Sequence, residues 1–137
     1  MPEEAILSIT ILLALAYAYG NGINDAANAI ATAISTRVLS PLNGVLLGAS
    51  MNLLGALTGT TVANTIGKGI VDPELMPQTA VMAAIISAVA WVLVATRFGF
   101  PISVSHSLVA GVLGAGVAVA GTAAVNMVTA TKVLLAL

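Results

Sequence analysis

Two stretches of the sequence gather the side chains that could bind ions. Residues 19–36 (YGNGINDAANAIATAIST) hold three Asn and one Asp among alanines and isoleucines. Residues 99–111 (GFPISVSHSLVAG) begin with a Gly- and Pro-containing turn and continue into four polar side chains: Ser103, Ser105, His106 and Ser107. Carboxylate, amide and hydroxyl oxygens are hard donors that favour hard cations over soft metals. Hydroxyls at the start of a helix favour an anion, because the free N–H groups there carry the positive end of the helix dipole.

The polar residues of the first stretch lie on one face of a helix. At 100° per residue they fall within an arc of roughly 90°. These residues are Asn21, Asn24, Asp25, Asn28, Thr32 and Ser35. An Asp at the centre of a bilayer costs about 2.5–3.5 kcal/mol on insertion scales, so it is tolerated where it faces a cavity, a partner or an ion. The stripe therefore predicts an ion or substrate site; the alternative is a structural polar seam or an interfacial helix.

The second stretch is predicted to start a helix near Pro101, which suits a first turn because its missing N–H is not needed there. On that helix Ser103, His106 and Ser107 share a face, whereas Ser105 points elsewhere. An anion site is one interpretation, and N-capping serines beside a core histidine are the other. His106 could also carry a proton. A serine protease is disfavoured, since the sequence lacks a G-x-S-x-G nucleophile elbow.

The composition places these stretches in a membrane protein. Of 137 residues, 59% are hydrophobic and 7% are charged, against about 25% charged in soluble domains. The net charge of −1 argues against a nucleic-acid partner, and the absence of Cys excludes disulfides and thiolate metal sites. We therefore predict an all-α integral membrane protein that crosses the lipid bilayer several times.

The apolar runs predict about four to five transmembrane segments, some of them broken half-helices, because a spanning helix needs about 20 apolar residues. The expected segments are 5–20, 23–35, 42–66, 79–96, 102–121 and 127–137. The first two are interpreted as halves of a broken helix or as two short half-helices, separated where Gly20 and Gly22 let the backbone unwind. Four basic residues near successive segment ends leave the orientation undetermined. They are Arg37, Lys68, Arg97 and Lys132.

The two stretches resemble the motifs of a known transporter family. GNGINDAANAIATAISTRVLSP resembles the signature G-x-N-D-x-A-N-A of the PiT family of inorganic phosphate transporters. GFPISVSHSLVAGVLGAGV resembles the second block of that family, P-[VI]-S-[TS]-[TS]-H-S, with Val104 where a hydroxyl residue is common. The two blocks stand in the family's order, and the resemblance covers nearly the whole chain.

The resemblance implies secondary active transport of inorganic phosphate by symport with Na⁺ or H⁺, with no enzymatic activity and no cofactor beyond the coupling cation. By this analogy Asp25, Asn28 and Ser103 bind the cation, Asp25 and Asn28 being the Na⁺ ligands if sodium is coupled. The residues assigned to phosphate are Asn24, Ser105, His106 and Ser107. Some relatives move sulfate, and the choice between phosphate and another oxyanion stays open.

The resemblance also implies one half of an inverted-repeat transporter, because full members carry two signatures and this chain carries one. Residues 1–137 are then a single transmembrane repeat in the cell (inner or plasma) membrane. The second half would be a copy in the opposite orientation, a separate partner or a continuation of the chain. Two other functions stand beside this one. The first is a non-transporting accessory subunit. The second is a small multidrug exporter, which is disfavoured because Asp25 is surrounded by Asn and Ala rather than aromatics.

Overall fold

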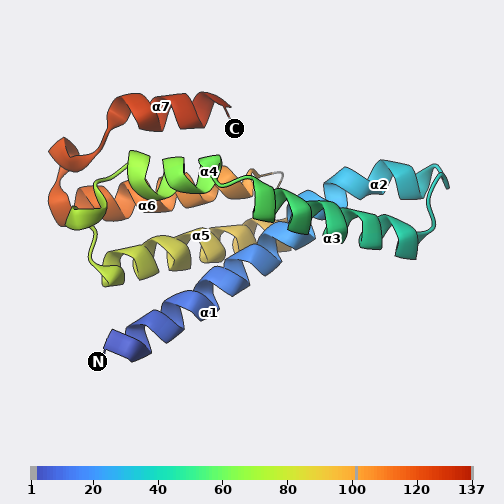
Figure 1. Cartoon of the computed structure of the whole chain (residues 1–137), viewed down its shortest axis with the longest axis horizontal. Coiled ribbons are helices and arrows are strands. Elements are labelled where there is room, and N and C mark those ends of the chain that lie inside the picture. Colours follow the sequence, from blue (N-terminus) through green and yellow to red (C-terminus); the bar gives the residue numbers. More distant parts are fainter. Residues whose placement is uncertain (1–2, 101, 137) are drawn as a thin grey trace.

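A single long helix forms the N-terminal part of the molecule (Figure 1). The computed structural model describes residues 3–100 and 102–136, and Glu3–Ser35 is continuous over 33 residues. It is made of α1 (Glu3–Asn21), a π-helical turn η1 (Gly22–Ala26) and α2 (Ala27–Ser35). At 1.5 Å per residue it is about 50 Å long, more than the hydrocarbon core of about 30 Å. It must therefore tilt or extend beyond the bilayer core.

The predicted break at Gly20 and Gly22 is wrong. Between Gly22 and Ala26 the backbone does not unwind; it stays helical and forms a wider, π-helical turn. The Asn24 side-chain amide donates a hydrogen bond to the Gly20 carbonyl at 3.1 Å, so this oxygen is satisfied within the wider turn. π-Helical turns are rare and occur frequently at functional sites.

A real break lies further along, where a single segment over 42–66 was predicted. Helix α3 (Pro41–Thr58) and the following helical stretch Thr61–Gly69 are bent by 58°. This stretch comprises α4 (Thr61–Asn64) and a second π-helical turn, η2 (Thr65–Gly69). Gly59 between them has an extended backbone, and a Gly followed by β-branched Thr residues has weak helix propensity. Sequence hydropathy alone does not locate such a bend.

The C-terminal half contains three helices and two short 3₁₀ turns. They are η3 (Pro73–Leu75), α5 (Gln78–Phe98), α6 (Val104–Ala120), η4 (Thr122–Ala124) and α7 (Met127–Ala136). Gly99 ends α5 with a left-handed φ of 68°, which allows the Phe100 N–H to donate to the Ala95 carbonyl at 2.9 Å. Helix α6 begins at Val104 with Ser103 as its N-cap; Pro101 lies outside the described residues.

Helix α5 packs against both α1 and α6 through a stripe of small side chains. Its buried residues recur at helical spacing and are Ala80, Ala84, Ala88, Val92 and Ala95. Gly111 on α6 lies so close to the Ala84 carbonyl oxygen that a Cβ added there would be 2.5 Å from it. Close backbone approach through small residues is how membrane helices associate. This contact holds α6, which carries the second sequence motif, against α5.

A small apolar core joins the loop after η2 to α6 and α7. Its buried residues are Ile70, Val71, Val109, Val125, Ala130 and Val133. Val71 and Val125 form an isolated antiparallel bridge, and the Asn126 N–H donates to the Ile70 carbonyl at 2.8 Å. Gly116 on α6 lies against Val71, where a Cβ would be 2.6 Å from a valine methyl group. The C-terminal helix is thereby fixed beside α6.

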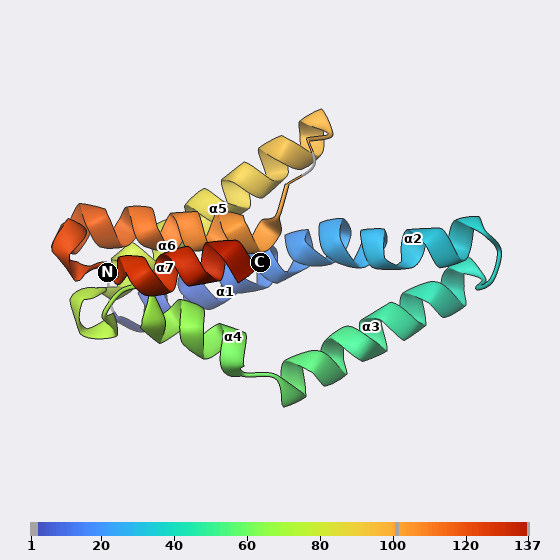
Figure 2. The same ribbon diagram turned by 90° about the horizontal axis from the view of Figure 1, so that it is seen from above.

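Helices α2 and α3 form a hairpin that extends away from the other helices (Figures 1 and 2). Gly44 and Gly48 of α3 receive the side chains of Ile34 and Ile30 from α2. The outer surface of α3 is apolar and exposed, with Leu42, Leu53 and Leu57 each more than 60% exposed. Such a surface suits lipid or another membrane segment.

Two of these helices are long and apolar enough to span a bilayer, Glu3–Ser35 and Gln78–Phe98, and a third span results if α3 and the stretch Thr61–Gly69 count as one. The predicted number of four to five also counted the regions of α6 and α7, which are apolar but shorter, with 17 and 10 residues. Except for the single Val71–Val125 bridge, residues 3–100 and 102–136 contain no β-structure.

Replacing Gly111 with Ala is expected to destabilise the protein by about 1–3 kcal/mol, because the added methyl group overpacks the contact with α5. Alanine is the better helix former, so helix propensity alone would predict the opposite sign. The control is Gly114→Ala on the same helix, where a Cβ meets no atom within 4 Å. Thermal unfolding in detergent measures both variants; equal melting temperatures for the two would refute the close contact.

Candidate functional site

Three polar residues of the first motif line one side of an open hollow. Asn24 and Asp25 lie in the π-helical turn η1, and Asn28 lies in the first turn of α2. The hollow has a volume of about 650 Å³. Its lining residues are Asn24, Asp25, Asn28, Thr96, Gly99, Phe100, Ile102 and Ser103, and we call it the Asp25 hollow. The structure thus brings the carboxylate of the first motif to the first serine of the second motif.

A hydrogen bond between Asn24 and Thr96 ties η1 to α5 at the Asp25 hollow. The Asn24 amide nitrogen donates to the Thr96 hydroxyl oxygen at 3.0 Å. Thr96 in turn donates to the Val92 carbonyl at 2.7 Å. Asp25 and Asn28 are exposed, and among the described residues neither side chain has a hydrogen-bond partner. Their oxygens therefore remain free to bind a ligand.

Asn21, one turn before Asp25, belongs to the same polar stripe. Its side-chain oxygen is buried and has no hydrogen-bond partner among the described residues. Thr32 and Ser35, at the far end of the stripe, are on α2 and do not line the Asp25 hollow. The part of the stripe that meets other elements is thus its N-terminal part.

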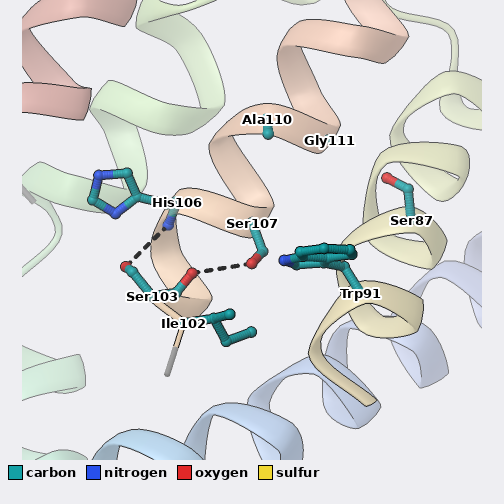
Figure 3. Close-up of a pocket in the computed structure, with 8 residues that line it drawn as sticks. All are labelled: Ser87, Trp91, Ile102, Ser103, His106, Ser107, Ala110 and Gly111. Carbon is teal, nitrogen blue, oxygen red and sulfur yellow. Dashed lines mark hydrogen bonds between the residues drawn. The ribbon is translucent and has the colours of Figure 1, made fainter. Parts of the chain in front are cut away.

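Ser103 connects the Asp25 hollow to a second one. Its hydroxyl oxygen accepts a hydrogen bond from the His106 N–H at 3.3 Å, which caps the first turn of α6 (Figure 3). The second hollow, of about 730 Å³, lies between α5 and α6. It is lined by Ser87, Trp91, Ile102, Ser103, His106, Ser107, Ala110 and Gly111, and we call it the Trp91 hollow. Ile102 and Ser103 line both hollows, so the two are neighbours.

The start of α6 is fixed in position by contacts on two sides. The Tyr17 hydroxyl of α1 donates to the Val104 carbonyl at 2.9 Å. The His106 Nε2 lies 3.1 Å from the Leu134 carbonyl of α7. Because a carbonyl oxygen can only accept, Nε2 must carry the proton. His106 Nδ1 is buried and has no partner among the described residues.

The polar residues of the second motif point in different directions. Ser107 points into the Trp91 hollow and donates to the Ser103 carbonyl at 3.0 Å (Figure 3). The His106 ring points away from Trp91 (Figure 3). Ser105 is half-buried and lines neither hollow, in agreement with its predicted position on another side of the helix.

Several residues of α5 at these hollows were not predicted from the sequence. Thr96 lines the Asp25 hollow, and Ser87 and Trp91 line the Trp91 hollow. Their segment is so apolar, with a mean hydropathy of 2.2, that its sequence is typical of a plain membrane span. The available signal was the spacing: Ser87 and Trp91 are four residues apart and share a face of the helix.

The geometry supports two kinds of binding side by side. The Asp25 hollow offers one carboxylate with amide and hydroxyl oxygens, which suit a hard cation. At the start of α6 the exposed Ser103 and the dipole of a 17-residue helix suit an oxyanion. A cation bound at Asp25 would lie close to an anion bound at this helix end.

Comparisons with known proteins place the chain in a family. The family model described as "Phosphate transporter family" matches residues 21–137. A "Probable low-affinity inorganic phosphate transporter" of Bacillus subtilis is 43% identical over 139 residues, which cover 98% of this chain and 42% of that protein. A protein of the same description from Mycobacterium tuberculosis is 40% identical over 116 residues, covering 85% of this chain and 28% of that protein.

A solved structure shares the fold. "The sodium-dependent phosphate transporter" superimposes with a TM-score of 0.86 at 35% identity, covering 96% of this chain and 34% of that one. This similarity confirms the predicted all-α membrane fold. The chain spans about two fifths of the length of the Bacillus protein and about a third of the solved one.

Proposed function

Because the chain belongs to the phosphate transporter family, we propose that it is part of a secondary active transporter that moves inorganic phosphate by symport with Na⁺ or H⁺. The observation that carries the proposal is the Asp25 hollow, where a carboxylate in a π-helical turn lies beside the capped start of α6. The family match and the apolar helices indicate an integral membrane protein. We place it in the cell membrane.

In this proposal the coupling cation binds to Asp25, Asn28 and Ser103. All three line the Asp25 hollow and are exposed to it. Carboxylate, amide and hydroxyl oxygens form a donor set that Na⁺ accepts, and the same carboxylate can take up a proton if H⁺ is the coupling ion. The solved relative is a sodium-dependent phosphate transporter, and this similarity favours Na⁺.

Phosphate binds next to the cation, at the start of α6. Asn24 and Ser107 are assigned to it because they line the two adjoining hollows on either side of Ser103. His106 lines the Trp91 hollow but bonds to Leu134, and Ser105 lines neither hollow, so their part in phosphate binding remains a prediction from the family resemblance. The free N–H groups at the start of α6 supply donors that phosphate oxygens require, and the Ser107 hydroxyl, whose proton is bound to the Ser103 carbonyl, can accept from the P–OH group.

Coupling follows from electrostatics. A carboxylate repels phosphate unless a cation lies between them, and a cation at Asp25 both cancels this repulsion and attracts the anion. Each ligand then improves the binding of the other by the same factor, because linkage is reciprocal. Neither ion binds well alone, which is what a symporter requires.

Residues 1–137 form one repeat in this proposal, completed by an inverted second half. The chain spans 42% of the Bacillus protein and 34% of the solved one, and Asp25 and Asn28 are open on one side. The second half is a copy in the opposite orientation, a separate partner or a further part of the same polypeptide. Its site would face the Asp25 hollow and reduce the access of water to the ions.

Equilibrium binding tests the proposal. The affinity for labelled phosphate is expected to rise by about 5- to 150-fold in saturating Na⁺ over choline at constant pH, and the affinity for Na⁺ should rise by the same factor with phosphate. If H⁺ is the coupling ion, acidification replaces Na⁺ in this test. A phosphate affinity that depends on neither cation would refute the coupling, and no phosphate binding would refute the substrate.

A further inference from the structure

Helix α5 forms the wall of the Trp91 hollow opposite α6, and we propose that Ser87 and Trp91 on this wall select hydrogen phosphate over sulfate. The inference rests on the proposed function, because it states how the phosphate site distinguishes two tetrahedral oxyanions. The hollow of about 730 Å³ has room for an anion with several waters, each of which occupies about 30 Å³.

Trp91 supplies a fixed hydrogen-bond donor. In Figure 3 its side chain reaches from α5 across the hollow, and the indole nitrogen points toward Ser107 of α6. The indole N–H can donate but cannot accept. None of the described residues accepts a hydrogen bond from it, and the side chain is 53% exposed. A free N–H group that can only donate is suited to bind an oxyanion oxygen.

Ser87 and Ser107 supply acceptors, because their protons are used elsewhere. The Ser87 hydroxyl donates to the Ala84 carbonyl at 2.9 Å. The Ser107 hydroxyl donates to the Ser103 carbonyl at 3.0 Å. In this arrangement the lone pairs of both oxygens are left to face the hollow. They can accept a hydrogen bond from any group that carries a proton.

These acceptors distinguish the two anions. Phosphate retains at least one P–OH group at neutral pH, which can donate to Ser87 or Ser107, whereas sulfate has no proton to give. Sulfate oxygens would face the serine lone pairs unless each hydroxyl gave up its bond to the backbone. A site that is built to hydrogen-bond a substrate hydroxyl strongly rejects an analogue without it.

The placement of Ser87 and Trp91 argues against a purely structural role. A tryptophan that anchors a membrane helix lies at the lipid interface, whereas the Trp91 ring extends into the space between α5 and α6 (Figure 3). Thr96, nine residues after Ser87, lies on another face of α5 and serves the Asp25 hollow. Helix α5 therefore lines the Trp91 hollow with one face and the Asp25 hollow with another.

Trp91 also provides its own probe, because it is the one Trp in the 137-residue sequence. The experiment measures tryptophan emission and equilibrium binding of labelled phosphate and sulfate to the full chain in proteoliposomes with Na⁺ present. The variants are Ser87→Ala and Trp91→Phe. The matched control is Ser50→Ala on α3, whose hydroxyl makes the same kind of bond to its own helix, at 2.7 Å to the Leu46 carbonyl.

We expect phosphate to change the emission saturably and sulfate to do so only at much higher concentration. Ser87→Ala should weaken phosphate binding by about five- to tenfold, since only phosphate uses the acceptor, and should strengthen sulfate binding, since the lone pairs that repel sulfate are removed. Trp91→Phe should weaken the binding of both anions by about tenfold, since both use the donor. Ser50→Ala should match the unmodified chain.

Each contrary outcome is distinct. Phosphate could bind without changing the tryptophan emission, and Trp91→Phe could keep the phosphate affinity of the unmodified chain. These two results together would overturn the role of the α5 wall while the proposed function stands. If Ser87→Ala weakened the binding of phosphate and of sulfate equally, this would overturn the proposal that the P–OH proton of phosphate is what the site selects. A chain that binds no labelled phosphate would overturn the proposed function and this inference together.

Discussion

Replacing Asp25 with Asn is expected to abolish the cation stimulation of phosphate uptake and to leave the fold intact. Among the described residues, Asp25 is the only charged one that lines the Asp25 hollow. A carboxylate that binds the cation directly attracts it by at least about 4 kcal/mol, the value for two unit charges about 4 Å apart at an effective dielectric constant of about 20. Cation affinity should therefore fall by about 1000-fold. Asn has the same shape, and the Asp25 side chain has no partner to lose within residues 3–100 and 102–136.

The measurement is labelled phosphate uptake into proteoliposomes as a function of Na⁺ concentration and pH. Asp72→Asn is the matched control, because Asp72 is exposed, lies in the loop before α5 and caps a short turn through an oxygen that Asn also has. Asp72→Asn should behave like the unmodified chain. Uptake by Asp25→Asn with the same cation dependence as the control would rule out Asp25 as the cation ligand.

Replacing Ser103 with Asp is expected to remove phosphate binding and to leave α6 in place. Aspartate caps a helix about as well as serine, so the bond to the His106 N–H can persist. The new carboxylate, however, lies on the boundary of both hollows. Two unit charges about 8 Å apart repel by about 2 kcal/mol at an effective dielectric constant of about 20. Phosphate affinity should fall by at least about 30-fold.

A second N-cap provides the control for this substitution. Ser40 caps α3 in the same way, its hydroxyl oxygen accepting from the Asn43 N–H at 3.3 Å, but it lies in the connection between α2 and α3 and lines neither hollow. Ser40→Asp should keep the phosphate affinity of the unmodified chain. Thermal unfolding shows whether either variant has lost stability. If Ser103→Asp binds phosphate normally, the anion does not bind at the start of α6.

The sequence predicted which polar residues share a helix face better than how the backbone presents them. The helical projection correctly separated the polar stripe around Asp25 from its apolar side, since side-chain spacing on a helix is regular. It could not predict that Gly20 and Gly22 stay helical, because a π-helical turn and an unwound segment are compatible with the same small residues. The bend at Gly59 was missed because residues 42–66 are apolar enough on average for one span, although the run TGTT at 58–61 has weak helix propensity.

The contribution of α5 shows a second limit of the sequence. Ala80, Ala84 and Ala88 were visible as small residues, but the role of this stripe as the surface that receives Gly111 depends on the distance between two helices. The polar positions of α5 appeared isolated in an apolar span. They become part of the site only because α5 packs between α1 and α6. Contacts between segments distant in sequence cannot be read from the periodicity of one segment.

The most direct test of cation-coupled phosphate transport is the accumulation of labelled phosphate in proteoliposomes that contain the full chain under an imposed cation gradient. An inward Na⁺ gradient at equal pH, or an inward H⁺ gradient without Na⁺, is expected to raise internal phosphate above the external concentration. An ionophore that dissipates the gradient should release the excess. Phosphate that only equilibrates across the membrane, whichever cation gradient is imposed, would contradict the proposed symport.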